Sequence, residues 1–583
     1  MVNIKINGTP YSVEDGSTIM EAAKVANVEI PHLCYLKEVN EIGACRLCCV
    51  EVEGENKLIP ACDNVVVEGM SIITNSPRVR KASRTNLELI MSKHNGNCTT
   101  CVRSGNCQLQ NLCIDFSLDT DLYEKYHDPE KKLPWKEGYP LIRDNDKCIK
   151  CMRCIQICDK VQTMHIWDTL GTGKHTHIGT FDGRSIHHTD CTLCGQCITH
   201  CPVGALRARD DTDRVIDAIS DPEVTVVFQI APAIRTAWGE PFGLDAKTAT
   251  VNRLAGCLKQ LGADYVFDTS FTADLTIMEE GNEFLKRLGK GDMEKYPMFT
   301  SCCPGWIRFI KKQFPKLVPQ LSSAKSPQQM FGAIMKTYFA EKIGVDPEKI
   351  FTVSIMPCVA KKAECDMDSM KTSYGANDVD VVLTTREVTR LLKKEHIPAD
   401  RVADAPFDKI MGEYSGAGVI FGTTGGVMEA ALRTAYFKVM GENPPEDLFK
   451  EVNGFGEHGA HPWTEKEFEL KGQKIRIAVV NSLGHARACC EAILREEVKY
   501  DFVEVMACPG GCSGGGGQPI NTEDEERAFA RGLYLHELDK GMPLRFSHEN
   551  TDVAKLYEDF LGEPLSEKSE ELLHVKHSLD FKF

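Results

Sequence analysis

Hydrophobic and polar residues alternate along the 583-residue chain in patterns that differ between its two ends. The first residues, V-N-I-K-I-N, alternate in the manner of a strand with one buried face. Ser17 and Thr18 then supply helix-capping side chains before a helical stretch that runs to Ala26, and a second helix is expected after Pro77. The pattern predicts a small β-rich domain over residues 1–78.

The pattern changes at about residue 210, where short apolar runs begin to alternate with helical stretches. Alternation of this kind is typical of parallel sheets covered by helices. Turns rich in Gly and Cys follow several of these runs, at the strand ends where open α/β sheets place their sites. The expected strands lie at residues 224–230, 264–268, 350–356, 379–383, 475–480 and 500–506.

Composition narrows the class of protein. With 68 basic and 84 acidic residues the net charge is −16, which argues against a nucleic-acid partner, because such binding depends on a basic surface. No apolar run approaches the ~20 residues of a membrane helix, and the first residues lack a secretion signal. We therefore expect a cytoplasmic protein without a membrane span. The expected domains are residues 1–78, 79–122, 139–209 and 210–583.

The 26 cysteines fall into tight groups, and two of these groups share one spacing. The run C-T-L-C-G-Q-C-I-T-H-C-P reproduces the ferredoxin pattern C-x2-C-x2-C-x3-C-P, and an earlier run repeats it with Asp159 in place of the proline. In two-cluster ferredoxins the fourth cysteine of each run binds the other cluster. The spacing predicts two [4Fe–4S] clusters, one on Cys148, Cys151, Cys154 and Cys201, the other on Cys191, Cys194, Cys197 and Cys158.

A group of four cysteines lies in the N-terminal domain. Its central C-x2-C is like that of plant-type [2Fe–2S] proteins, although the spacing before it is wider. The pattern predicts a [2Fe–2S] cluster. The expected ligands are Cys34, Cys45, Cys48 and Cys62.

A third group is one cysteine short of a [4Fe–4S] cluster. It consists of Cys98, Cys101 and Cys107. His94, upstream of the three, can supply the fourth ligand through a ring nitrogen. We therefore expect His94 to be the fourth ligand, with Cys113 as the rival for this position.

The α/β region carries a second set of cysteines, each placed just after an expected strand. They are Cys303, Cys358, Cys508 and Cys512, far apart in sequence but at equivalent strand ends. Converging loops would join them into one more four-thiolate site. The glycines around Cys512 would let the backbone approach a bulky inorganic group.

Three motifs in this region, T-S-C-C-P-G-W, M-P-C-V-A-K-K and E-V-M-A-C-P-G-G-C, resemble the signatures of the [FeFe] hydrogenases. The resemblance covers essentially the whole chain. It implies an α/β catalytic domain with two parallel-sheet halves and an H-cluster between them. It also implies an N-terminal β-grasp [2Fe–2S] domain and ferredoxin-like α+β iron–sulfur domains.

The resemblance assigns roles around the H-cluster, a cubane joined to a two-iron unit with CO and CN⁻ ligands. The four cysteines of the α/β region would bind the cubane, with Cys512 as the bridging thiolate. Cys302 would relay protons, and Lys361 would donate to a cyanide. The residues that would line the cofactor site are Met356, Met506, Ala231, Pro232, Gln328, Phe421 and Gly422.

A proton relay is implied by the same resemblance. Glu280 and Glu283 lie three residues apart, on one face of a helix. Ser322 would stand between them, and Arg287 would lie near the surface. Ala233 departs from the pattern of some members of this family, which have at this position a serine that donates to a cyanide.

The function implied is reversible proton reduction to H₂, with electrons relayed through one [2Fe–2S] and three [4Fe–4S] clusters. The expected partners are ferredoxin, or the flavin/NADH-binding and [2Fe–2S] subunits of an electron-bifurcating complex, together with maturation enzymes. A non-catalytic iron–sulfur protein of the same fold and a hydrogen sensor are the alternatives. Cys302, Lys361, Glu280 and Glu283 favour the enzyme, and no added sensory domain is visible.

Overall fold

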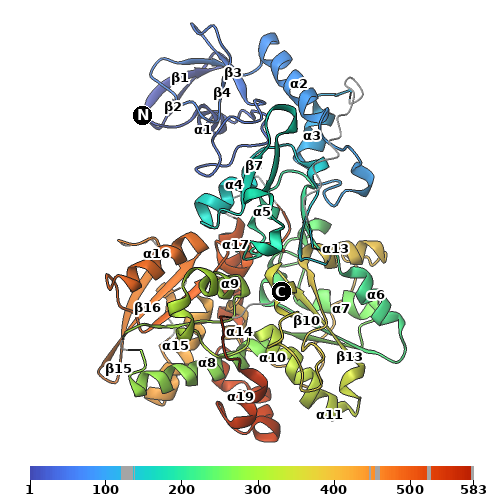
Figure 1. Ribbon diagram of the computed structural model, residues 1–583, viewed down its shortest axis with the longest axis vertical. Helices are drawn as coiled ribbons and strands as arrows, with labels where there is room; N and C mark the ends of the chain where they lie inside the picture. Colours follow the sequence, from blue (N-terminus) through green and yellow to red (C-terminus); the bar gives the residue numbers. More distant parts are fainter. Residues whose placement is uncertain are drawn as a thin grey trace. The chain divides into compact units, whose positions relative to one another are not determined.

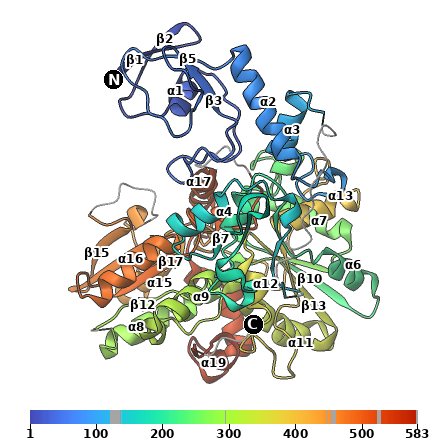
Figure 2. The ribbon, with the colours of Figure 1, turned by 45° about the horizontal axis from the view of Figure 1, so that its top comes forward.

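The computed structural model describes residues 1–119, 135, 136, 138–293, 295–445, 448–452, 460–520 and 527–579 (Figures 1 and 2). Residues 120–122 of the expected 79–122 domain lie outside this set. The chain forms two compact units. The first comprises Met1–Val161, His165–Thr189 and His200–Arg207, and the second comprises Gln162–Met164, Asp190–Thr199 and Ala208–Phe583.

The first unit begins with a five-stranded sheet in the order β2-β1-β5-β3-β4. The helix α1 (Ile19–Val25) begins at Thr18, whose hydroxyl accepts from the amide of Glu21 while the Glu21 carboxylate accepts from the Thr18 amide. The predicted cap and the predicted first strand are both confirmed. The strands are β1 (Val2–Ile6), β2 (Thr9–Val13), β3 (Cys49–Val52), β4 (Ile59–Pro60) and β5 (Ser71–Ile73).

Short elements make up the rest of this unit. The helix expected after Pro77 is α2 (Pro77–Met91), capped by the Ser76 hydroxyl. The others are α3 (Gln108–Asp115), β6 (Leu141–Arg143), α4 (Arg153–Gln156), β7 (Trp167–Leu170), β8 (His177–Thr180) and β9 (Leu206–Ala208).

The second unit contains two four-stranded sheets that include all six predicted α/β strands. The first sheet is wholly parallel, in the order β11-β10-β13-β14, and the second has the order β12-β17-β16-β15. The strands of the first are β10 (Thr225–Ile230), β11 (Tyr265–Asp268), β13 (Ile350–Met356) and β14 (Val381–Thr384). Those of the second are β12 (Met298–Phe299), β15 (Thr464–Leu470), β16 (Gln473–Asn481) and β17 (Phe502–Met506).

The edge strand β15 departs from the parallel arrangement that the resemblance implies for both halves. It runs antiparallel to β16, and only Lys471 and Gly472 separate the two strands. Both residues have positive φ, 48° and 81°, as the tight hairpin turn that matches strand twist requires. The sequence T-E-K-E-F-E-L leaves one face of β15 exposed, which an antiparallel edge strand tolerates.

Helices lie against both sheets. Figure 1 shows α16 (Leu483–Leu494) beside β16, and α7 (Val251–Leu261) and α13 (Thr385–Lys394) contact β11 and β14. The longest described helix is α8 (Ser270–Lys290), whose first half is buried. The others are α5 (Gln196–Thr199), α6 (Thr212–Ser220), α9 (Pro304–Gln313), α10 (Pro327–Ile334), α11 (Ala340–Ile343), α12 (Ala360–Glu364), α14 (Gly416–Ile420), α15 (Gly426–Met440), α17 (Arg527–Gly541), α18 (Thr551–Leu556) and α19 (Glu567–Leu573).

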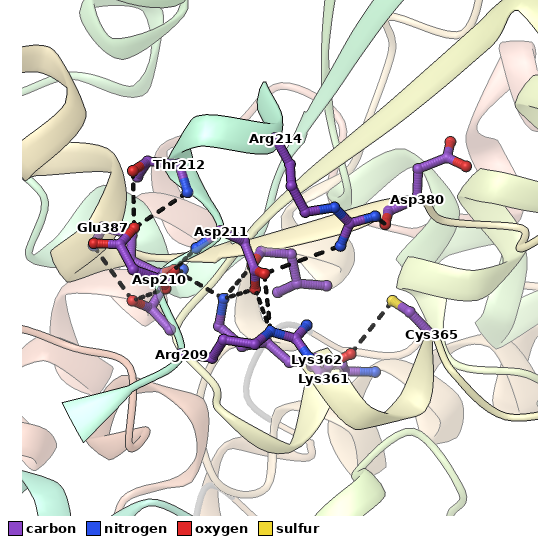
Figure 3. A network of polar contacts seen from close by, with 12 residues as sticks. Arg209, Asp210, Asp211, Thr212, Arg214, Lys361, Lys362, Cys365, Asp380 and Glu387 are labelled. Atoms are coloured by element: carbon purple, nitrogen blue, oxygen red, sulfur yellow. Dashed lines mark hydrogen bonds and ion pairs between the residues drawn. The ribbon is translucent and has the colours of Figure 1, made fainter. Parts of the chain in front are cut away.

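A buried lysine fixes the short helix α12 (Figure 3). The Nζ of Lys362 lies 2.7 Å from Asp211 Oδ2 and 2.9 Å from Glu387 Oε1, and it donates to the carbonyl of Val382. Burial raises the pKa of Asp211, but Lys362 and Arg209 outweigh burial, and the pKa is lowered. The contacts join α12, β14, α13 and the segment before α6. They therefore hold the helix that begins just after Cys358.

Replacing Lys362 by Ala should destabilise the protein strongly. The change leaves the buried carboxylate of Glu387 without its ion-pair partner, while Asp211 keeps its ion pair with Arg209. Breaking a buried pair costs about 3–5 kcal/mol. The measurement is the urea midpoint of unfolding. As a control, Lys349→Ala removes an exposed ion pair with Glu223 and should leave the midpoint unchanged. Equal midpoints for the two variants would contradict the role given to Lys362.

Candidate functional site

A buried cavity of about 80 Å³ lies within the second unit. Four of the predicted ligands line it: Cys303, Cys358, Cys508 and Cys512. Cys303 is the N-cap of α9, Cys358 follows β13, and Cys508 follows β17. Strand ends from both sheets therefore contribute to one cavity, where open α/β sheets place their sites.

The cavity wall includes the other residues predicted around the cofactor. Cys302 and Lys361 line it, and so do Ala231, Pro232, Gln328, Met356, Phe421, Gly422 and Met506. Ala233, noted as a departure, is also a lining residue. Lining residues that the sequence did not single out are Thr269, Ala273, Pro304, Pro327, Pro357, Ala507, Gly511 and Gly515.

Glycines let the loops around the cavity pass close to one another. A Cβ on Gly515 would lie 2.1 Å from the carbonyl oxygen of Pro357, and one on Gly517 would lie 2.7 Å from the amide nitrogen of Cys358. A Cβ on Gly422 would lie 2.9 Å from the amide nitrogen of Ala233. Any side chain at these positions would displace the segments that carry the cysteines.

The cavity fits a polynuclear group better than a single ion. Five cysteines line the void, whereas no three His, Cys, Asp or Glu side chains among the described residues are placed to hold one metal ion. Burial raises the pKa of the Cys358 thiol to about 12, so this thiol keeps its proton until a metal displaces it. Cysteine thiolates are the ligands that iron–sulfur clusters take.

Lys361 is held toward the cavity by a carboxylate that the sequence analysis missed. Its Nζ lies 2.9 Å from Glu364 Oε2 and 3.2 Å from the carbonyl oxygen of Cys302. Burial lowers the pKa of Lys361, but Glu364 and neighbouring thiols outweigh burial, and the pKa is raised. The i,i+3 spacing of Lys361 and Glu364 was the signal that could have identified the pair.

The two glutamates of the predicted relay lie on α8 in different environments. Among the described residues, neither carboxyl oxygen of Glu280 has a hydrogen-bond partner of ordinary geometry. Burial, reinforced by the charge of Glu283, raises the pKa of Glu280 to about 8, although the hydroxyl of Ser322 lowers it in part. Glu280 therefore exchanges a proton near neutral pH.

Glu283, by contrast, is fully hydrogen-bonded. Its carboxylate accepts from the Ser322 hydroxyl at 2.9 Å, from the Ser323 amide at 3.0 and 3.2 Å, and from Arg287 at 2.6 Å. Arg287 is half-buried and also donates to the carbonyl of Leu321. The structure thus brings Ser322, Glu283 and Arg287 into contact, while Glu280 stands beside them without a direct hydrogen bond.

The expected [2Fe–2S] ligands come together in the first unit. The thiols of Cys34 and Cys45, of Cys34 and Cys62, and of Cys48 and Cys62 interact directly. Cys34 lowers the pKa of Cys62, but Cys48 and burial outweigh it and raise that pKa to about 12. Three of the four side chains are fully buried, which suits a cluster shielded from water.

One of the two ferredoxin-type groups is also assembled within the first unit. A small cavity of about 10 Å³ is lined by Cys148, Cys151, Cys154 and Cys201. Arg143 donates to the sulfur of Cys148 at 3.2 Å and lies 3.9 Å from that of Cys154. N–H donors of this kind tune the potential of a bound cluster.

The third group keeps both candidate ligands close by. His94 is buried, and its Nδ1 lies 3.0 Å from the carbonyl oxygen of Lys147. Because a carbonyl only accepts, Nδ1 carries the hydrogen, and Nε2 is the nitrogen with the lone pair. Burial, with the charges of Cys107 and Cys98, raises the pKa of Cys113 to about 11, so Cys113 is also a neighbour of the group.

Buried polar side chains connect the three groups of the first unit. Asn40 donates from one amide nitrogen to the carbonyls of Cys34 and Cys151, at 2.7 and 2.9 Å. Arg153 donates to the Cys34 carbonyl at 3.2 Å, and Arg103 donates to the Cys201 carbonyl at 3.0 Å. Two polar side chains thus join the [2Fe–2S] group to the ferredoxin-type group, and one joins the ferredoxin-type group to the group with Cys98, Cys101 and Cys107.

In the second unit, the segment with Cys191, Cys194 and Cys197 packs on the loop after Cys508. A Cβ on Gly516 would lie 2.3 Å from the carbonyl oxygen of Cys194. The Cys508 sulfur lies 3.8 Å from the same oxygen. This cysteine group is therefore in direct contact with the cavity wall, whereas Cys158 belongs to the first unit and stays a prediction as the fourth ligand.

A thiol-lined cavity in the second unit, together with the cysteine groups found in each of the two units, defines an iron–sulfur redox protein. The family described as "Iron only hydrogenase large subunit, C-terminal domain" matches residues 224–516, and "Iron hydrogenase small subunit" matches residues 525–578. A "2Fe-2S iron-sulfur cluster binding domain" matches residues 1–77. The "NADH-ubiquinone oxidoreductase-G iron-sulfur binding region" matches 84–121, and the "NADH-quinone oxidoreductase subunit 3, ferredoxin-like domain" matches 140–207.

Relatives match the chain over its whole length. It is 44% identical to the NADP-reducing hydrogenase subunit HndD of Solidesulfovibrio fructosivorans, over 99% of both chains. It is 39% identical to Iron hydrogenase 1 of Clostridium pasteurianum, over 99% of this chain and 100% of that one. A variant of apo [FeFe]-hydrogenase HydA1 from Chlamydomonas reinhardtii matches with a TM-score of 0.54 and 40% identity, over 63% of this chain and 98% of that chain.

The chain therefore belongs to the iron-only, or [FeFe], hydrogenases, and the resemblance seen in its motifs is confirmed. It is an enzyme in which [2Fe–2S] and ferredoxin-like iron–sulfur domains precede the hydrogenase domain. Among the described residues, no helix is both long and apolar enough to cross a membrane.

Substituting His94 tests the open ligand of the third group. We expect His94→Ala to alter the electron paramagnetic resonance signal of one cluster while Cys113→Ala leaves every signal unchanged. His94→Cys should rebuild that cluster at a lower potential, because a thiolate adds the negative charge that a neutral imidazole lacks. Loss of the signal in Cys113→Ala, with His94→Ala unaffected, would make Cys113 the ligand.

Proposed function

We propose that this enzyme joins two protons and two electrons into H₂, and catalyses the reverse reaction, at an H-cluster bound by Cys303, Cys358, Cys508 and Cys512. The observation that carries the proposal is the placement of these four cysteines around one cavity. Cys302 and Lys361 belong to the same wall. When bound, the H-cluster supplies the iron centre at which electrons and protons meet.

Two side chains of the wall have distinct tasks in this proposal. Lys361 keeps its positive charge beside Glu364. In the loaded enzyme its ammonium would donate to an anionic cyanide ligand. Cys302 is adjacent to Cys303 in the chain but is not a ligand, so its thiol hydrogen remains available for transfer. Burial raises the pKa of Cys302, which keeps the thiol protonated in the absence of an acceptor.

The proton route runs from Arg287 through Glu283 and Ser322 to Glu280 and on to Cys302. The hydrogen bonds around Glu283 and Ser322 support the outer part. The inner part is supported by the buried Glu280, whose pKa of about 8 is close to the pH at which a general acid or base is most effective. The charge of Glu280 also contributes to the raised pKa of Cys302, as expected of neighbouring groups.

The electron route uses one [2Fe–2S] and three accessory [4Fe–4S] clusters. The proposed ligands are the predicted cysteines and His94, and fully matured protein should then hold about twenty iron atoms. We propose that electrons enter from ferredoxin or from a partner subunit that oxidises a nicotinamide. The similarity to an NADP-reducing hydrogenase subunit and the small-subunit match support such a partner. Maturation enzymes would install the two-iron unit.

A non-catalytic iron–sulfur protein and a hydrogen sensor are the alternatives, and neither is favoured. A protein without turnover has no use for a carboxyl held near neutral pKa beside the cavity. The presence of Glu280, Glu283, Cys302 and Lys361 together supports catalysis.

Glu283→Gln tests the proposed function. After expression with the maturation enzymes, the parent should evolve H₂ from a reduced dye. Glu283→Gln should do so about 10²–10⁴-fold more slowly, the contribution of a general acid–base group, because an amide cannot take up and release the proton. The infrared bands of CO and CN⁻ should be the same in both proteins.

A control separates the relay from a general effect of removing a carboxylate. Glu341→Gln makes the same change at an exposed position on α11 and should keep full turnover. Full turnover in Glu283→Gln as well would refute the proposed proton route, and no turnover in the matured parent would refute the proposed activity.

A further inference from the structure

The last described segment of the chain packs on the turn that holds the proposed relay. The amide of Lys325 donates to the carbonyl of Leu573 at 2.7 Å, and the amide of Val575 donates to the carbonyl of Ser323 at 2.7 Å. Ala324 and His574 form an antiparallel bridge between these two hydrogen bonds. Residues 573–575 therefore form a short ladder with residues 323–325, which we call the C-terminal ladder.

Glu279 anchors this ladder to α8. Its carboxyl group is fully buried and accepts from the amide of Leu565 at 2.9 Å and from the hydroxyls of Tyr557 and Ser569. His574 Nε2 lies 3.0 Å from the same carboxylate. Burial raises the pKa of Glu279, but His574, Ser569 and Tyr557 together outweigh burial, and the pKa is lowered. Glu279 therefore stays charged and acts as a fixed acceptor.

His574 connects Glu279 to the Ser322–Ser323 turn. A carboxylate only accepts, so Nε2 is the donor to Glu279, and in the neutral ring Nδ1 accepts from the Ser323 hydroxyl at 2.8 Å. The Ser323 amide then donates to both oxygens of Glu283. One continuous chain of hydrogen bonds thus joins Glu279 to Glu283 through His574 and Ser323.

A second histidine holds the neighbouring residue of the turn. His577 Nε2 lies 2.9 Å from the carbonyl oxygen of Ser322. Burial lowers the pKa of His577 to about 4, so the ring is neutral and donates to this carbonyl. Ser322 and Ser323, the two serines that donate to the Glu283 carboxylate, are therefore both held by the C-terminal segment.

We propose that Glu279 and His574 are positioning residues that keep the Ser322–Ser323 turn, and through it the Glu283 carboxylate, in place for proton transfer. This inference rests on the proposed relay. Neither residue carries the transferred proton. They fix the donors to Glu283 from outside, as outer partners orient the ligands of a metal. The segment matched by the small-subunit family thus contributes to the proton route of the catalytic domain.

The test compares His574→Ala and Glu279→Gln with a matched histidine variant, His548→Ala. His548 also contacts polar groups through both ring nitrogens, Thr434 Oγ1 at 3.2 Å and Asn443 Oδ1 at 2.8 Å, but neither group belongs to the relay. Glu279→Gln keeps the size and most of the hydrogen bonds of the side chain. It is therefore the variant to measure if His574→Ala fails to fold. The first measurement is amide hydrogen exchange over residues 321–326 in protein made without maturation enzymes.

We expect faster exchange over residues 321–326 in His574→Ala and in Glu279→Gln, and parent-like exchange in His548→Ala. In matured protein, His574→Ala and Glu279→Gln should each turn over about 10-fold more slowly. This is the lower end of the effect of removing a residue that orients a functional group. Their solvent isotope effect on turnover should rise, because proton delivery becomes limiting, and their CO and CN⁻ bands should stay unchanged. A purely structural role would not change the isotope effect.

The outcomes separate this inference from the relay on which it rests. Unchanged exchange over residues 321–326 in both variants overturns the positioning role of Glu279 and His574, whatever turnover the variants show. The positioning role is also overturned if His574→Ala and Glu279→Gln both keep the turnover and isotope effect of the parent while Glu283→Gln is slow. In that case the relay itself stands. Parent-like turnover in Glu283→Gln overturns the relay itself. The exchange measurement then shows only whether Glu279 and His574 hold the Ser322–Ser323 turn in the folded protein.

Discussion

Burial of the ionisable groups around one cavity is the constraint on which the rest of the second unit depends. Desolvation penalises the charged form of every ionisable group around it. Thiols such as Cys358 therefore keep their protons until a metal replaces them, and Glu280 retains a proton near neutral pH. Lys361 stays charged because the buried Glu364 carboxylate, with smaller contributions from neighbouring thiols, outweighs burial. The same desolvation thus prepares the thiols for metal and a carboxyl for proton exchange.

Helix α8 shows how the surroundings give three neighbouring carboxyls different tasks. Glu279 is surrounded by donors and stays charged as an anchor. Glu280 has no such donors and keeps a raised pKa of about 8. Glu283 sits among Arg287, Ser322 and Ser323, at the outer end of the proposed route. Residue type is identical at the three positions, so the partners decide the chemistry.

The sequence predicted the parts of the structure that depend on local pattern. Strand periodicity located β10, β13 and β17. Cysteine spacing identified the group that lines the smaller cavity, and position after the expected strands identified the four cysteines that line the larger one. It missed Glu364, although its spacing from Lys361 was a usable signal. It also missed Ser323 and His574, because 251 residues separate them and no local pattern links residues so far apart. The antiparallel edge strand β15 was missed because its polar, exposed face gives little apolar signal.

The central claim is that Cys302 and Cys303, adjacent in the chain, have different tasks: Cys303 binds the cluster and Cys302 moves the proton. The most direct test is the infrared spectrum of matured Cys302→Ala, recorded with its rate of H₂ evolution. Our account predicts CO and CN⁻ bands like those of the parent and loss of most turnover, with partial turnover regained in Cys302→Asp because a carboxyl can still relay a proton. Loss of the bands in Cys302→Ala would contradict it and make Cys302 a structural residue of the cluster site.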